Sequence, residues 1–256
     1  MIALLIGVSR RNLIELRRYG FDTLFQFAGI FMLFALLFWG AKGVGGADIR
    51  EGDTLPAIVV GFVVLSLVLG AFFSTSQWLT QEATLGTLEQ IAMSPFGLLN
   101  VLLAEAVASL WFLGITTGAM LLGAEALSGQ WLHLDAVTLA PLVALLLLQM
   151  VGISLMVGGA AVVFKRVASL ANLLQFVFLA LVSLPVAEYP AVRYMPISLA
   201  NELIRESTVH KVGLLDMNRG DLLQLAVLAG AYFAIGVVVF RRCERTARQR
   251  GLIGAH

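Results

Sequence analysis

The stretch LPAIVVGFVVLSLVLGAFFSTSQW, residues 55–78, contains 24 residues and no charged side chain. Aliphatic and aromatic residues dominate it from end to end. An α-helix rises 1.5 Å per residue, and about 20 apolar residues suffice to cross the roughly 30 Å hydrocarbon core of a bilayer. The stretch therefore predicts a transmembrane helix.

Five further apolar segments of similar length accompany this one, at residues 21–41, 97–123, 137–163, 170–187 and 221–240. The chain of 256 residues is 59% hydrophobic and 13% charged, whereas soluble domains are about 25% charged. Backbone groups in lipid must be hydrogen-bonded internally, and no segment alternates as a barrel strand does. We predict an all-α membrane protein, with residues 1–256 forming one transmembrane domain of six helices.

Charged residues are divided unevenly between the two sides of these predicted spans. If the N-terminus is cytoplasmic, the inner side carries eleven basic residues and the outer side six, whereas five acidic residues lie inside and ten outside. Cytoplasmic loops are enriched in Lys and Arg. We therefore expect a multi-pass protein of the plasma or inner membrane with both termini in the cytoplasm. The net charge of +1 gives no basic excess for nucleic acid.

The segment before the first span predicts a helix on the membrane surface. Over residues 1–20, Ile2, Leu5 and Leu13 share one helical face, and Arg11 and Glu15 occupy the opposite one. An amphipathic pattern of this kind is typical of a helix lying in the interface. We expect residues 1–20 to form an interfacial helix on the inner side.

The longest outer connection, residues 188–220, predicts a second short helix. In SLANELIREST, Ser198 can cap a helix whose Leu199 and Leu203 face one way. The fifth span is short and ends at Pro185, and Pro cannot continue a helix without losing a hydrogen bond. We therefore expect residues 188–220 to form an extracytoplasmic, partly re-entrant region.

A polar stretch, LGTLEQIAMSP at residues 85–95, links the second and third spans on the inner side. Residues 80–93 contain good helix formers, and Ser94-Pro95 stops the helix before the third span. Gly86 costs about 1 kcal/mol relative to alanine within a helix, which favours a position where another surface approaches the backbone. The pattern predicts a short cytoplasmic helix over residues 80–95.

This segment resembles the signature of the ABC exporter type-2 permease family, in which Gly-Thr-Leu-Glu-Gln and a later Ser/Thr-Pro follow the second of six spans. The matching positions are Glu82, Gly86, Thr87, Leu88, Glu89, Gln90, Ser94 and Pro95. In that family the segment is a coupling helix that docks on a separate ATPase subunit. Here TQEATLG lacks the family's usual basic residue, so docking would rest on Glu82, Glu89 and the shape of the backbone.

The resemblance covers essentially the whole chain and implies a set of partners. The family's assembly pairs two copies of an ATP-binding subunit with this permease and a second copy of the same or a similar permease. ATP and Mg²⁺ would be bound by the partner subunit, and no cofactor by this chain, which lacks G-x-x-x-x-G-K-[ST]. The implied activity is export of an amphipathic or lipid-linked substrate, such as a drug, lipid or glycolipid.

Polar residues inside the spans have two interpretations. In the second span Ser66, Gly70, Ser74 and Gln77 recur at helical spacing, and in the fifth span Asn172 and Gln175 share a face. Small and amide side chains favour close packing between membrane helices. In the resembled family the same two spans would line a substrate path at the face between two permease copies. Both interpretations remain open.

Glu105 is the carboxylate that the sequence places within a predicted span. An ionised group there costs at least about 2.5 kcal/mol, so it should be protonated, paired or near water. A structural hydrogen bond or a proton-coupled secondary carrier would each explain it. The three histidines show no metal-ligand spacing, and no nucleophile-base set indicates an enzyme. A non-transporting membrane assembly factor is a third alternative.

Overall fold

The computed structural model describes residues 54–84, 91, 97–129, 132, 134–163, 168–184, 186 and 189–249, with nine residues between 28 and 39. Helices, and no strands, make up the regular structure of this part of the chain. The elements are α4 (Thr54–Thr84), α6 (Leu98–Ser128), α7 (Ala136–Val163), α8 (Ala168–Ser183), the 3₁₀ helix η1 (Pro190–Tyr194), α9 (Ser198–Val209) and α10 (Arg219–Gln249). The all-α prediction is confirmed for the described residues.

Four of these helices are long and apolar enough to cross a membrane: α6, α7, α10 and the Pro56–Ser76 part of α4. They correspond to the third, fourth, sixth and second predicted spans, as expected for a multi-pass membrane protein. The helix α8 corresponds to the fifth span but has 16 residues, about 24 Å of helix and less than the bilayer core. Within the first span, the described residues between 28 and 39 are helical, and the predicted interfacial helix lies outside the described residues.

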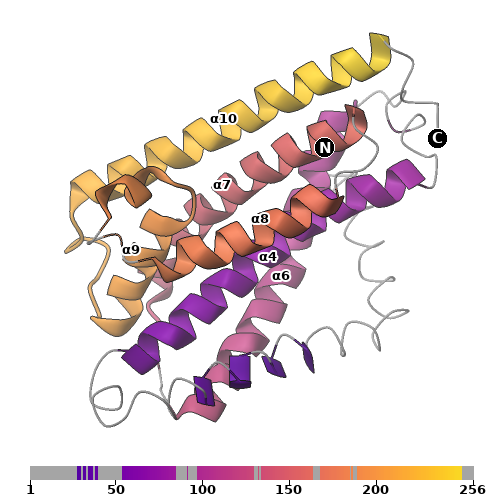
Figure 1. Cartoon of the computed structure of the whole chain (residues 1–256). Coiled ribbons are helices and arrows are strands. Elements are labelled where there is room, and N and C mark those ends of the chain that lie inside the picture. The colour runs from indigo at the N-terminus through magenta and orange to yellow at the C-terminus, as the bar shows by residue number, and fades with distance from the viewer. Residues whose placement is uncertain are drawn as a thin grey trace.

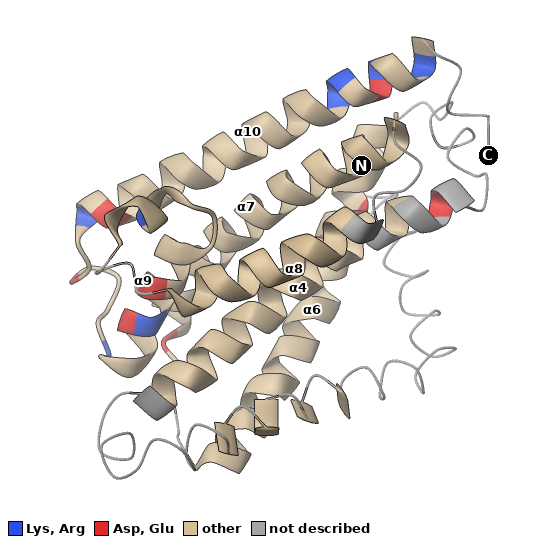
Figure 2. Cartoon of the chain, in the orientation of Figure 1, with Lys and Arg blue, Asp and Glu red and all other residues tan. Residues whose placement is uncertain are grey.

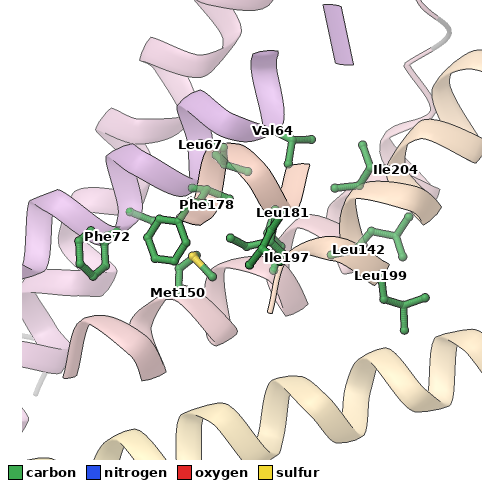
Figure 3. Close-up of a cluster of buried hydrophobic side chains, with 14 of the residues drawn as sticks. Val64, Leu67, Phe72, Leu142, Met150, Phe178, Leu181, Ile197, Leu199 and Ile204 are labelled. Carbon is green, nitrogen blue, oxygen red and sulfur yellow. The ribbon is translucent and has the colours of Figure 1, made fainter. Parts of the chain in front are cut away.

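The helix α4 lies at the centre of the bundle, in contact with α6, α7, α8 and α9, while α10 packs along α7 (Figure 1). Figure 3 shows the largest buried cluster, where side chains of α4 meet those of α7, α8 and α9. Phe72 of α4 meets the ring of Phe178 of α8 edge-on at a centroid distance of 5.2 Å. Because aromatic pairs prefer this geometry, the contact aligns α8 on α4.

Glycines set the contact between α7 and α10. A methyl group at Gly236 would lie 2.8 Å from the Cα of Gly152, and one at Gly152 would lie 2.8 Å from the Cα of Phe233. One turn or more beyond, a methyl group at Gly159 would lie 3.1 Å from the Cα of Phe240. Small residues at these positions let the two backbones touch, which makes α7 and α10 a closely packed pair.

The bundle has two ends, which Figure 2 distinguishes by charge. At one end α4, α7 and α10 finish and α6 begins; we call it the basic end, because the last turns of α10 carry exposed arginines. At the other, the α9 end, η1 and α9 lie beside the start of α10. The central stretches of α4, α7, α8 and α10 carry no charged residue. This arrangement is typical of helices whose middles face lipid.

Several helices extend past the predicted spans. The helix α4 continues to Thr84 rather than residue 78, α6 to Ser128 rather than 123, and α10 to Gln249 rather than 240. The residues added include many polar ones, but they are compatible with a helix and include no proline. Hydropathy therefore marks where a helix leaves the apolar layer, and the helix itself ends further on.

Candidate functional site

Part of the predicted coupling helix belongs to α4. Thr80 to Thr84 continue α4 without a break, so the expected separate helix beginning at residue 80 is wrong at its start. Thr80, Gln81 and Glu82 favour helix continuation, and nothing in the sequence interrupts it before Gly86. Ile91 is helical. The other motif positions lie outside the described residues: Gly86, Thr87, Leu88, Glu89, Gln90, Ser94 and Pro95.

The two described flanks of this segment meet in one apolar cluster at the basic end. Trp78 and Leu79 from α4 pack there with Leu98 and Leu102 from α6, and with Phe240 from α10. Ile91 packs against the same cluster. The described residues on either side of positions 85–96 therefore lie in one cluster with Phe240, directly before the arginines of α10.

Two buried carboxylates lie on the helices that flank the segment. Glu82 of α4 is 6% exposed and Glu105 of α6 is 7% exposed. Each has a polar interaction, as a buried carboxylate requires. Trp78, one turn before Glu82, has a buried indole N–H with no hydrogen-bond partner among the described residues. These buried polar groups therefore lie on two of the helices that contribute to the apolar cluster at the basic end.

A third buried carboxylate was missed because the predicted third span stopped at residue 123. Glu125 is 2% exposed, lies within α6 near the α9 end, and accepts a hydrogen bond of 3.0 Å from the backbone N–H of Leu132. Its own backbone carbonyl accepts the N–H of Gly129, which has the left-handed φ of 71°. Glu125 closes the end of α6, a structural role that its loop assignment concealed.

The structure describes the surroundings of three residues of the polar stripe predicted on the second span, Ser66, Gly70 and Ser74. Ser66 and Ser74 donate their hydroxyls to carbonyls of their own helix, at 2.9 Å from Phe62 and 3.1 Å from Ala71. Gly70 lies against Leu113 of α6, where an added methyl group would clash. The side chain of Gln77 lies outside the described part of the chain. The contact at Gly70 matches the close-packing interpretation.

Asn172 and Gln175 do not join this stripe within the chain. Both side chains are exposed on α8, beside large exposed apolar residues such as Leu173 and Phe176. An amide exposed among apolar side chains lacks the partners that a membrane interior requires. Their position is consistent with a face of α8 that meets something other than lipid.

Polar side chains at the α9 end form long-range hydrogen bonds that were not expected from the sequence. Gln149 of α7 is 2% exposed, and its Oε1 accepts a bond of 3.1 Å from the backbone N–H of Ile197. Ile197 has a φ of 78° and precedes α9. A β-branched residue in this left-handed region is strained, so the bond holds the chain in the turn that starts α9.

The helix α9 lies within the predicted outer region, and Ser198 does not cap it as expected. Ile197 occupies the cap position, and Ser198 donates instead to the carbonyl of Leu181, at 3.4 Å. Asn201 donates to the carbonyl of Val182, at 3.0 Å. Both acceptors lie in the last turn of α8, whose carbonyls have no partner within their own helix. α9 therefore caps the C-terminal end of the short helix α8.

An ion pair ties η1 to the start of α10. The guanidinium of Arg193 contacts the carboxylate of Asp221, and its Nε donates a bond of 2.9 Å to Oε1 of Gln224. Tyr232 donates its hydroxyl to the carbonyl of Tyr194, at 3.3 Å. The predicted outer region is thus attached to α7, α8 and α10 by directed polar bonds.

The described residues contain no group of three His, Cys, Asp or Glu side chains arranged to hold a metal ion. His210 is exposed after α9, and His133 lies outside the described part of the chain.

Comparison with protein-family models found no match for the chain, and a search of curated proteins found none either.

Proposed function

We propose that the chain is the membrane permease subunit of an ATP-driven exporter, resembling the ABC exporter type-2 permeases. The substrate would be amphipathic or lipid-linked, and a separate ATP-binding subunit would supply the energy. The finer topology belongs to the same proposal: six spans, cytoplasmic termini, a coupling helix after α4 and a re-entrant region that includes α9. The basic end would then face the cytoplasm, because it carries the exposed arginines of α10.

The observation that carries this proposal is the continuity of α4. One helix of 31 residues runs from Thr54 to Thr84 and leads directly into LGTLEQIAMSP. It contacts α9 as well as α6, α7 and α8. A single helix resists bending because its backbone bonds are all internal, so a push on residues 85–95 would reach the α9 end along α4.

Glu89→Arg tests this proposal, with Asp216→Arg as its control. Asp216 is exposed at the α9 end, so its reversal changes the same charge far from the coupling segment. The chain is co-expressed with an ATP-binding subunit that co-purifies with it, and substrate-stimulated ATPase activity is measured on the purified complex. We expect Glu89→Arg to lower stimulation at least about tenfold, the effect of roughly 1.4 kcal/mol of lost contact energy. Equal activity in the two variants would contradict docking through this segment.

The buried carboxylate of Glu105 favours one competing function, a proton-driven secondary carrier. The interaction that Glu105 makes agrees better with a structural role, because a proton relay needs several ionisable groups along its path. Transport by the isolated chain that stops when the proton gradient is collapsed, and that Glu105→Gln abolishes, would support the carrier. A membrane assembly factor would instead show no substrate movement to lose.

A further inference from the structure

One exposed ridge runs the full length of α10. Its first part is apolar, with Leu223, Val227 and Val238 exposed by 68%, 61% and 49%. Exposed Arg241, Arg245 and Arg248 follow at helical spacings of three and four residues. Leu223 and Arg241 are 18 residues apart, which is five whole turns at 3.6 residues per turn. The arginines therefore continue the face that the apolar residues begin.

The change from apolar to basic occurs at the thickness of a membrane. Between Asp221 and Arg241, the 19 residues Leu222 to Phe240 carry no charge and span about 28 Å. The hydrocarbon core is roughly 30 Å thick. The arginines therefore begin where the core gives way to headgroups, and the helix keeps them there because it continues to Gln249.

This ridge is accessible and strongly basic. Only 17% of the apolar stretch of α10 is buried, against 39% to 44% of the apolar stretches of α4, α6 and α7. Glu244, the acidic residue in the last three turns, is bound to Arg248 at 2.7 Å. Arg241, Arg242 and Arg245 are exposed and contribute three further positive charges. Guanidinium groups match phosphate oxygens with two parallel hydrogen bonds.

We propose that the α10 ridge binds an anionic phospholipid, with its acyl chains along the adjoining half of the apolar part and the headgroup phosphate on Arg241 and Arg245. An occupant beside the arginines must be anionic at one end and apolar along the adjoining half of the ridge, about 14 Å, because one leaflet is half of the roughly 30 Å core. A phospholipid leaflet has this chemistry, whereas a water-soluble acidic protein would match only the arginines. The site requires only that α10 crosses the membrane, and it does not depend on the exporter proposal.

The test compares two triple variants of the full chain. In the first, Arg241, Arg242 and Arg245 become Gln; in the control, Arg205, Lys211 and Arg219 become Gln. The control residues are equally exposed cations at the α9 end. Each purified protein is titrated in detergent with dioleoyl phosphatidylglycerol or dioleoyl phosphatidylcholine, and bound lipid is counted by native mass spectrometry. Circular dichroism verifies that both variants retain their helices.

The unaltered chain should prefer phosphatidylglycerol, and the first variant should lose at least about tenfold of that preference. Each basic residue near an anionic surface contributes a factor of about five. The control variant and a triple Arg→Lys variant should keep most of it. An unchanged preference in the first variant, or an equal loss in the control, would overturn the proposal.

Two further arms separate a lipid from other anions and partners. Short-chain dihexanoyl phosphatidylglycerol should bind more weakly than the dioleoyl form, and millimolar inorganic phosphate should not displace the latter. Equal binding of both chain lengths, or displacement by phosphate, would reduce the site to a general anion site and contradict the acyl-chain part. If the first variant instead lost the ATP-binding subunit while keeping its lipid, the arginines would be a protein contact and the proposal would fail.

Discussion

Apolar side chains pack at both ends of the bundle, and the α9 end adds several long-range polar bonds. At the α9 end, polar groups far apart in the sequence bond to one another, as Gln149 does with Ile197 and Arg193 with Asp221 and Gln224. At the basic end, a cluster of apolar side chains from α4, α6, α7 and α10 joins the helix ends. Directed bonds specify one arrangement, whereas apolar contacts allow small shifts between neighbouring packings.

This difference predicts which end of the bundle can change its packing. If the basic end receives force from a nucleotide-hydrolysing partner, as we propose, the apolar cluster can shift there while the hydrogen-bonded α9 end keeps its geometry. Small movements at one site are passed on when packed helices move as rigid bodies. The pair α7 and α10 reaches both ends, so changes to it should have the largest effect.

Gly236→Ala should destabilise the fold more than any other change considered. A methyl group at Gly236 would lie 2.8 Å from the Cα of Gly152 and meet its carbonyl, so two backbones would have to separate. Overpacking of this kind costs about 1–3 kcal/mol or more. The midpoint temperature of thermal unfolding in detergent should fall markedly. The difference between the two ends should disappear, because both ends would lose stability together.

Gly230→Ala provides the matched control on the same helix. Nothing lies within 4 Å of a methyl group placed at Gly230, so the midpoint should remain the same or rise slightly. A fall of similar size in both variants would mean that glycine matters for the helix itself, and that the contact between α7 and α10 contributes little.

Gln149→Met should weaken the α9 end specifically. Methionine keeps the approximate volume but removes the acceptor for the N–H of Ile197, and an unpaired buried donor costs about 1–3 kcal/mol. Hydrogen-exchange mass spectrometry should show faster exchange in peptides from residues 189–209 and little change near residues 98–102. Ser154→Ala, which removes a bond within α7 itself, should leave both regions unchanged. Uniformly faster exchange would contradict the separation of the two ends.

The membrane helices were predictable because lipid imposes a simple length and composition on each of them. Their ends were not, since residues such as Thr80 and Glu82 are polar enough to leave the membrane yet remain in the helix. The truncated third span also concealed Glu125, which the helix α6 includes near its end. Hydropathy indicates whether a residue lies in lipid or in water. It does not show where the backbone hydrogen bonds of a helix end.

The polar contacts of the α9 end could not be predicted from the sequence, for a different reason. Gln149 lies in an apolar run, where its partner could be any backbone N–H in reach, and the tertiary fold alone brings Ile197 to it. Ser198 had a local role available as a helix cap, but a carbonyl of α8 competes for its hydroxyl. The coupling segment was chosen by resemblance, and of its eight motif positions the described residues include Glu82.

The smallest expected effect gives the sharpest test, because one substitution should act in opposite directions at two threonines. Thr138 is fully buried at the α9 end, and its hydroxyl accepts a bond of 3.0 Å from the N–H of Leu214. Thr75 is 2% exposed, in the half of α4 that is nearer the basic end of the bundle. Its hydroxyl has no hydrogen-bond partner among the described residues. Valine has nearly the same shape as threonine but lacks the hydroxyl. Thr138→Val should therefore cost about 1–2 kcal/mol, and Thr75→Val should be neutral or stabilising, because it removes an unpaired buried polar group. Thermal unfolding of both variants in one detergent measures the difference, and equal losses would show that hydrogen bonding contributes similarly at the two ends.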